Sequence, residues 1–179
     1  DLGFYIQVNT TITRRNHAQV DALAEMLARY RIAMWSVFFL VPVGRGQTEE
    51  RISAEEYEEV FARLWQQSLS RPYAVKTTEA PHYRRFILRQ AERDRMPLER
   101  RRIRSLVGVG DGRGIMFVSH LGEIYPAGFL PVFCGIFPKA SIVDVYQRHP
   151  VFQALRQPDR FRGKCGKCAY RYVCGGSRS

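Results

Sequence analysis

Three cysteines near the end of the chain are the residues whose types and spacing point most clearly to chemistry. Cys165, Cys168 and Cys174 stand in the pattern C-x2-C-x5-C, within KCGKCAYRYVCGG. Two cysteines three positions apart can direct both thiolates at one metal centre, and a third cysteine six positions later can join the same centre with little intervening chain. Gly166 and Gly175 suit the tight turns that such a site needs.

Three interpretations of these thiols are open: an iron–sulfur cluster, a structural zinc site, and disulfides or unligated cysteines. Zinc sites usually pair two CxxC units or add histidines at fixed offsets, and here only the distant His120 and His149 are available. Disulfides are typical of secreted chains, and nothing in the sequence indicates secretion. The missing fourth ligand weakens the zinc interpretation, but the spacing does not decide among the three.

Three β-prone segments in the first part of the chain are expected to position functional groups. Strands are expected over residues 4–12 (FYIQVNTTI), 34–41 (MWSVFFLV) and 73–78 (YAVKTT). The second segment is an almost continuous apolar run that ends before Pro42, as is typical of a parallel strand covered on both faces.

A helical pattern follows each of these strands. Residues 17–30 carry apolar side chains at i, i+3, i+4 and i+7, with Asn16 as the expected N-cap. Ser53 and Glu56 form a capping box for a second helix, and a third helix is expected from Pro81 to about residue 90. The alternation predicts an α/β fold with a parallel sheet, open or barrel-like, whose functional groups gather at the carboxyl ends of the strands. So few strand–helix units cannot close a barrel.

A smaller α+β unit is expected after residue 105, which divides the chain into domains 1–105 and 106–179. Residues 115–125 predict a hairpin that turns at Leu121-Gly122. Beyond it, Ser141 is expected to cap one short helix and Pro150 to start another.

The formal net charge of +11 raises the question of an anionic partner. Residues 84–104 contain nine arginines and three acidic residues. Pro97 and the scarcity of large apolar side chains favour a solvated helix end and linker, and binding of RNA or of a carboxylate-rich substrate is the alternative.

No apolar run is long enough to span a bilayer. We expect a cytoplasmic protein that does not insert into a membrane, and a chain that is one part of a longer protein.

Taken together, these segments resemble radical SAM proteins that carry a C-terminal SPASM or twitch extension. The tail segments GDGRGIMFVSHLGEIYPAGFLP, SIVDVYQRHPVFQALR and KCGKCAYRYVCGGSR carry the resemblance. At the front, IQVNTTITRRN and MWSVFFLVPVGRG are similar to the fifth and sixth strands of the family's partial TIM barrel, in the branch near haem side-chain-modifying enzymes. The resemblance spans nearly the whole chain. It implies the C-terminal half of a partial (β/α) TIM-type barrel, followed by a small cysteine-bearing α+β domain like SPASM.

The resemblance also implies cofactors. An auxiliary [4Fe–4S] cluster would be held by the three tail cysteines, and its fourth ligand would be Cys134, a non-cysteine group or a cysteine beyond Ser179. Cys134 lies in the apolar stretch VFCGIF, so a plain buried thiol is the competing interpretation. An S-adenosylmethionine pocket would lie along the strand ends. Its candidate residues share one face by strand alternation or lie on the next strand: Gln7, Asn9, Thr11 and Ser36. Satisfying backbone groups at the strand end is the competing role for Asn9 and Thr11.

The chain departs from the family pattern in two ways. The CxxxCxxC loop that holds the radical-generating cluster and the first four or so barrel strands are absent, so we do not expect this chain to generate a radical by itself. Many relatives carry a further cysteine where this chain has Ala127 and Gly128, and another near Ser177. One auxiliary cluster is therefore expected.

The expected partners are a peptide or tetrapyrrole substrate, an electron donor such as a ferredoxin or flavodoxin, and the missing N-terminal radical SAM half. The alternative function is a non-catalytic iron–sulfur or zinc module that binds RNA through its arginine-rich segment.

Overall fold

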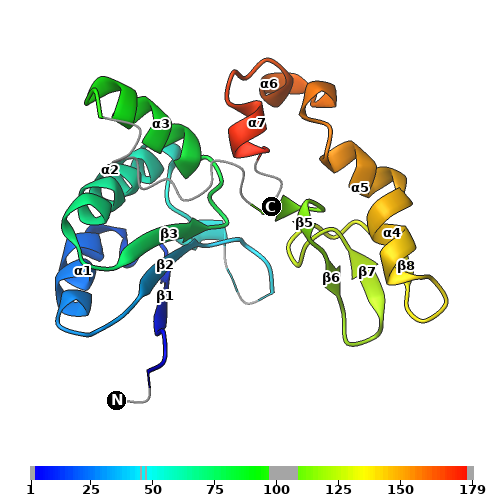
Figure 1. The fold of residues 1–179 in the computed structure, drawn as a ribbon, viewed down its shortest axis with the longest axis horizontal. Helices are drawn as coiled ribbons and strands as arrows, with labels where there is room; N and C mark the ends of the chain where they lie inside the picture. Colours follow the sequence, from blue (N-terminus) through cyan, green and yellow to red (C-terminus); the bar gives the residue numbers. More distant parts are fainter. Residues whose placement is uncertain (1–2, 45, 47, 97–108, 177–179) are drawn as a thin grey trace. The chain divides into compact units, whose positions relative to one another are not determined.

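A computed structural model describes residues 3–44, 46, 48–96 and 109–176. The chain divides into two compact units, Asp1–Met96 and Pro97–Ser179 (Figure 1). The predicted boundary between residues 105 and 106 lies outside the described residues, as do residues 97–104 of the arginine-rich segment.

The first unit alternates strands and helices, as the sequence predicts. In chain order its elements are β1 (Gln7–Ile12), η1 (His17–Gln19), α1 (Val20–Ala28), β2 (Met34–Phe39), η2 (Thr48–Glu50), α2 (Ala54–Ser70), β3 (Ala74–Thr78) and α3 (Tyr83–Arg93). The strands form one parallel sheet in the order β1-β2-β3, and Figure 1 shows the three helices stacked to one side of it. The fold is mixed α/β.

The core of this unit lies between the helices and one face of the sheet. Trp35, Val37 and Phe39 alternate along β2 and are buried against helix side chains that include Phe61 and Leu64. The buried Trp35 Nε1 donates a hydrogen bond of 2.9 Å to Oγ1 of Thr10 on β1. Because strand neighbours point to opposite faces, the residues between these core positions lie on the other face.

Several predicted boundaries differ from the structure. The first strand begins at Gln7 rather than at residue 4, and the third helix begins at Tyr83 rather than at Pro81. Asn16 lies at an N-cap position, as predicted, directly before η1, but its side chain makes no capping hydrogen bond. Instead, Asn16 Oδ1 accepts from the backbone N–H of Thr13 at 2.8 Å. The side chain therefore closes the turn that follows β1.

The second unit is built of short elements. They are β4 (Gly110–Asp111), β5 (Gly114–Ile115), β6 (Phe117–Val118), β7 (Glu123–Tyr125), β8 (Gly135–Ile136), α4 (Ile142–Arg148), α5 (Pro150–Leu155), η4 (Pro158–Arg160), α6 (Gly163–Gly166) and α7 (Arg171–Cys174). Strands β6, β7 and β8 form an antiparallel sheet. The predicted hairpin, the Ser141 cap and the start of a helix at Pro150 are confirmed.

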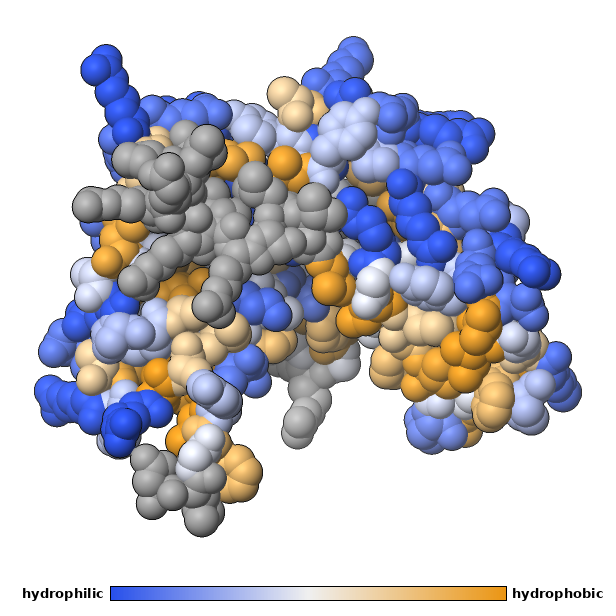
Figure 2. All heavy atoms as spheres, in the orientation of Figure 1, coloured by the Kyte–Doolittle hydropathy of each residue, from blue (hydrophilic) through white to orange (hydrophobic). Residues whose placement is uncertain are grey.

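A small core holds this unit together, and a further apolar surface remains exposed. Ile124, Cys134, Val145 and Phe152 are the buried residues of the core. Apolar side chains also gather on the surface over β6 and β7, where Phe117 is more than one third exposed (Figure 2). No helix in the described part of the chain combines the length and the hydropathy that a membrane crossing requires.

Candidate cofactor and cluster sites

The four side chains predicted to face a cofactor lie on one face of the β1–β3 sheet. Gln7, Asn9 and Thr11 alternate along β1 and are all exposed. Ser36 is the register partner of Asn9 on β2, so it lies on the same face, opposite the face that the helices cover, but unlike the β1 residues it is buried, with 1% of its surface exposed. Nε2 of Gln7 donates a hydrogen bond of 2.7 Å to Oδ1 of Asn9.

Two further polar residues on this face come from β3. Lys76 is the register partner of Ser36, and Thr78 lies two residues along the same strand. The hydroxyl oxygens of Ser36 and Thr78 are 3.2 Å apart and share a hydrogen bond. Neither Lys76 nor Thr78 was predicted from the sequence as a site residue. The alternation of the predicted strand 73–78 would have placed Lys76 and Thr78 together, but the pairing with Ser36 depends on the register of the sheet.

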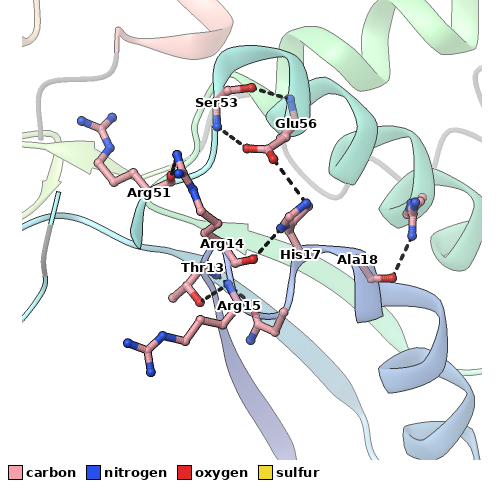
Figure 3. Close-up of polar contacts among 10 residues, drawn as sticks. Thr13, Arg14, Arg15, His17, Ala18, Arg51, Ser53 and Glu56 are labelled. Carbon is pink, nitrogen blue, oxygen red and sulfur yellow. Dashed lines mark hydrogen bonds and ion pairs between the residues drawn. The ribbon is translucent and has the colours of Figure 1, made fainter. Parts of the chain in front are cut away.

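The carboxyl end of β1 is held by a network of backbone and side-chain contacts, shown in Figure 3. The backbone N–H of Arg14 donates to the Glu50 carbonyl oxygen at 2.8 Å, which joins the loop after β1 to the segment before α2. His17 adds a second link. Its Nδ1 lies 3.0 Å from the Arg14 carbonyl oxygen, and its Nε2 lies 3.4 Å from a carboxylate oxygen of Glu56.

Glu56 also completes the predicted capping box of α2. The Ser53 N–H donates to Glu56 Oε2 at 2.6 Å, and the Glu56 N–H donates to Ser53 Oγ at 3.2 Å. The same carboxylate therefore fixes both the start of α2 and the ring of His17. The consequence is a rigid frame at the edge of the sheet where α/β folds bind ligands.

The loop after β3 lies at the same edge of the sheet and has two unusual features, the backbone conformation of Glu79 and the packing of the His82 ring. Glu79 has a φ of 62°, a left-handed conformation that is uncommon for a residue other than glycine. His82 follows three residues later, and its ring packs edge-on against Phe61 and at a tilt against Tyr57. Burial, reinforced by the guanidinium of Arg85, lowers the pKa of His82. The imidazole is therefore held in its neutral form near pH 7.

The three tail cysteines lie on two very short helices and the turn between them. Cys165 belongs to α6, Cys174 is the last residue of α7, and the Cys168 N–H donates to the Cys165 carbonyl oxygen at 3.2 Å. Cys165 is exposed, whereas Cys168 and Cys174 are half-buried. All four cysteines of the chain lie within the described residues, and none forms a disulfide.

Two glycines shape this tail. A Cβ on Gly166 would lie 2.2 Å from the carbonyl oxygen of Phe161, so only glycine fits there without rearrangement. Gly175 ends α7 with a φ of 73°, the left-handed C-cap conformation in which glycine is favoured. The predicted need for tight turns at these two positions agrees with the backbone.

Asp159 fastens the helix that carries Cys174. Its carboxylate accepts hydrogen bonds from the Tyr172 hydroxyl and from Arg171 Nη2, the latter at 3.2 Å. These bonds lower the pKa of Asp159 and raise the pKa of Arg171. Arg171 Nη1 also donates to the Cys168 carbonyl oxygen at 3.3 Å, so one guanidinium connects Asp159 to the turn between the helices.

Cys134 has a different environment. It lies in the core with Ile124 and Phe152, and its thiol donates to the Val132 carbonyl oxygen at 3.3 Å. Burial raises its pKa, which favours the thiol over the thiolate that metals require. These features agree better with a packed core thiol than with a ligand.

The chemistry of the tail fits an iron–sulfur cluster, because three reduced thiols lie within ten residues and Lys164 and Lys167 flank them. The described residues do not, however, bring three Cys, His, Asp or Glu side chains together around one point that could hold a metal ion.

Comparison with known proteins identifies several relatives, although no family model matches the chain. It is 32% identical over 179 residues to the AdoMet-dependent heme synthase of Methanosarcina barkeri, covering 98% of this chain and 51% of that protein. It is also 32% identical to the proteins of the same name from Oleidesulfovibrio alaskensis and Nitratidesulfovibrio vulgaris, covering 47% and 50% of them. The chain thus spans about half the length of the curated relatives it matches.

Proposed function

The chain belongs to the radical SAM family, and from that premise we propose that it is the C-terminal part of an AdoMet-dependent enzyme that modifies a tetrapyrrole. The observation that carries the proposal is the 32% identity to AdoMet-dependent heme synthases over 98% of this chain. The match includes both the strands of the first unit and the cysteine tail, so it covers the two places where chemistry is expected.

In this proposal the polar face of the sheet contributes to the AdoMet pocket. Gln7, Asn9 and Thr11 present amide and hydroxyl groups beside Ser36, and such groups hydrogen-bond the ribose and methionyl parts of a nucleoside ligand. The parallel sheet would be the C-terminal half of a partial barrel, completed by strands from the other half of the protein. When bound, AdoMet together with a reduced iron–sulfur cluster supplies the radical chemistry of the family.

The cysteine tail would hold an auxiliary [4Fe–4S] cluster through Cys165, Cys168 and Cys174. The role of the tail is to provide thiolates at fixed spacing, and the Asp159–Arg171 contact holds α7 in place for Cys174. Cys134 is the weaker candidate for the fourth ligand because of its core position. A ferredoxin or flavodoxin would deliver electrons to the complete enzyme.

Calorimetric titration of the full chain with AdoMet tests the pocket. We expect measurable binding that is weakened at least about fivefold in Asn9→Ala, because a lost hydrogen bond to a ligand typically costs about 1 kcal/mol. Gln66→Ala, an exposed change on α2, is the matched control and should bind as the unmodified chain does. Equal affinities in all three proteins would contradict the assignment of this face.

A further inference from the structure

Lys76 stands out because it is the one charged side chain in the described strands of the parallel sheet. The three strands read QVNTTI, MWSVFF and AVKTT. Strands of parallel sheets are usually covered on both faces and are apolar on both. Here the helix-covered face is largely apolar, whereas the other face is mixed: amides, hydroxyls and one ammonium group lie on it beside Met34, Phe38 and Ala74. A sheet face of this kind suits contact with a polar ligand rather than with a second layer of helices.

The position of Lys76 follows from the register. Asn9 on β1 pairs with Ser36 on β2, and Ser36 pairs with Lys76 on β3. The three side chains therefore form one row across the sheet, about 10 Å long at the usual strand spacing of about 4.8 Å. Ser36 in the middle of the row is 1% exposed, so a ligand of nucleoside or amino-acid size would contact the exposed ends of the row, Asn9 and Lys76.

The row is rich in hydrogen-bond donors. Asn9 Oδ1 already accepts a bond from Gln7, which leaves the amide nitrogen of Asn9 as its donor group. Ser36 is buried; when its hydroxyl donates to Thr78, the hydroxyl hydrogen of the half-buried Thr78 is left for another acceptor. Lys76 contributes three N–H donors and a full positive charge.

Lys76 also lacks a compensating charge. It forms no ion pair and no side-chain hydrogen bond with any residue that the structure describes, and no acidic residue lies on β1, β2 or β3. An ammonium group set among neutral donors attracts an anionic acceptor. A carboxylate matches both the charge and the donors.

We propose that Lys76 recognises a carboxylate of the small molecule that binds against this face, with Asn9 and Thr78 as neutral donors beside it. The inference rests on the proposed function and makes it more specific. Two carboxylates are relevant: the methionyl carboxylate of AdoMet and the side-chain carboxylates of an anionic tetrapyrrole. Lys76 is a binding residue in this proposal, and it sets which ligands are accepted.

The first arm of the test compares AdoMet with decarboxylated AdoMet by calorimetry on the full chain. If Lys76 contacts the methionyl carboxylate, the chain should prefer AdoMet by about tenfold to a hundredfold, the range expected for a charge-assisted hydrogen bond. Lys76→Gln should remove this preference, Lys76→Arg should keep most of it, and Lys139→Gln, which removes an exposed charge from the second unit, should leave it unchanged.

The second arm uses a porphyrin that carries propionate side chains and its methyl ester, with binding followed by the porphyrin absorption band. If Lys76 contacts the substrate, Lys76→Gln should weaken binding of the acid but not of the ester, and it should leave AdoMet affinity intact. Circular dichroism of each variant checks that it is folded.

The outcomes separate this inference from the proposed function. If the unmodified chain binds AdoMet or porphyrin but Lys76→Gln alters no preference for the carboxylate form, the Lys76 assignment is wrong and the proposed function stands. If the chain binds neither ligand, the proposed pocket and the Lys76 inference fail together.

Discussion

The Asp159 carboxylate accepts a hydrogen bond from the Tyr172 hydroxyl, and this contact joins η4 to the helix that ends in Cys174. The two residues are thirteen positions apart, so the bond closes a loop around Cys165 and Cys168. It sets where the third thiol lies relative to the first two.

We predict that Asp159→Asn weakens the hydrogen bonds that attach α7 to η4. An amide carries no charge to pair with Arg171, so the helix should detach more often and a reconstituted cluster should lose iron several-fold faster in the presence of a chelator. Tyr172→Phe removes one of the two bonds and should have a smaller effect of the same sign. Asp144→Asn, at the exposed Asp144–Arg148 pair on α4, is the control. Iron release at the same rate in all these proteins would show that the contact does not support the cysteines.

A second prediction concerns Gly166. Because the added methyl group of Gly166→Ala would collide with the Phe161 carbonyl oxygen, the turn at α6 must open, and we expect the variant to take up less than half as much iron on reconstitution. Gly110 has open space where a Cβ would be added, so Gly110→Ala should behave as the unmodified chain. Full iron uptake by Gly166→Ala would mean that the turn is dispensable.

Neighbouring threonines on β1 provide a third test, because they lie on opposite faces of the sheet. Thr10→Val leaves the buried Trp35 Nε1 without its acceptor, and we expect the free energy of unfolding to fall by about 1–3 kcal/mol. Thr11→Val changes the exposed polar face and should alter this free energy by less than about 0.5 kcal/mol. Urea unfolding of both variants makes the comparison. A larger loss for Thr11→Val would contradict the arrangement of the faces.

The pH dependence of stability follows from His82. Its pKa is lowered in the folded protein by burial and by Arg85, so below pH of about 6.5 the unfolded chain binds a proton that the folded chain resists. The contribution of neutral His82 to the free energy of unfolding is therefore complete above about pH 6.5. It is lost as the pH falls through that value towards the lowered pKa of the folded state. We expect the urea midpoint to decrease between about pH 7.5 and 5.5.

The matched variants for that experiment are His82→Gln and His120→Gln. The first removes a half-buried imidazole, whose Nδ1 has no hydrogen-bond partner in the part of the chain that the structure describes, and it should flatten the pH profile. The second removes an exposed imidazole and should leave the profile unchanged. Parallel profiles for His82→Gln and the unmodified chain would exclude His82 as the cause.

The comparison of sequence with structure shows which features are encoded locally. The Ser53–Glu56 capping box, the Ser141 cap and the hairpin about Gly122 were predicted because each depends on residues a few positions apart. Asn16 also occupies a typical capping position, but its amide bonds to the turn at Thr13 and to the Thr11 carbonyl oxygen. Local preference does not show which of two nearby backbone partners a side chain takes.

The features that were not predicted depend on contacts between distant segments. The row Asn9–Ser36–Lys76 can be identified only when the register of the three strands is known. The Asp159–Tyr172 contact depends on the path of the chain through α6. By contrast, the relationship to radical SAM proteins was predicted correctly, because the motifs that carry it are continuous stretches of sequence.

The central claim is that the tail holds an iron–sulfur cluster in a radical SAM protein. The most direct measurement is anaerobic reconstitution of the full chain with iron and sulfide, with metal and sulfide counting and EPR of the reduced protein. We predict about four irons and four sulfides per chain, lost in Cys165→Ala and Cys174→Ala and retained in Cys134→Ala. Tight zinc without sulfide, or iron that is retained when Cys165 or Cys174 is replaced, would contradict the claim.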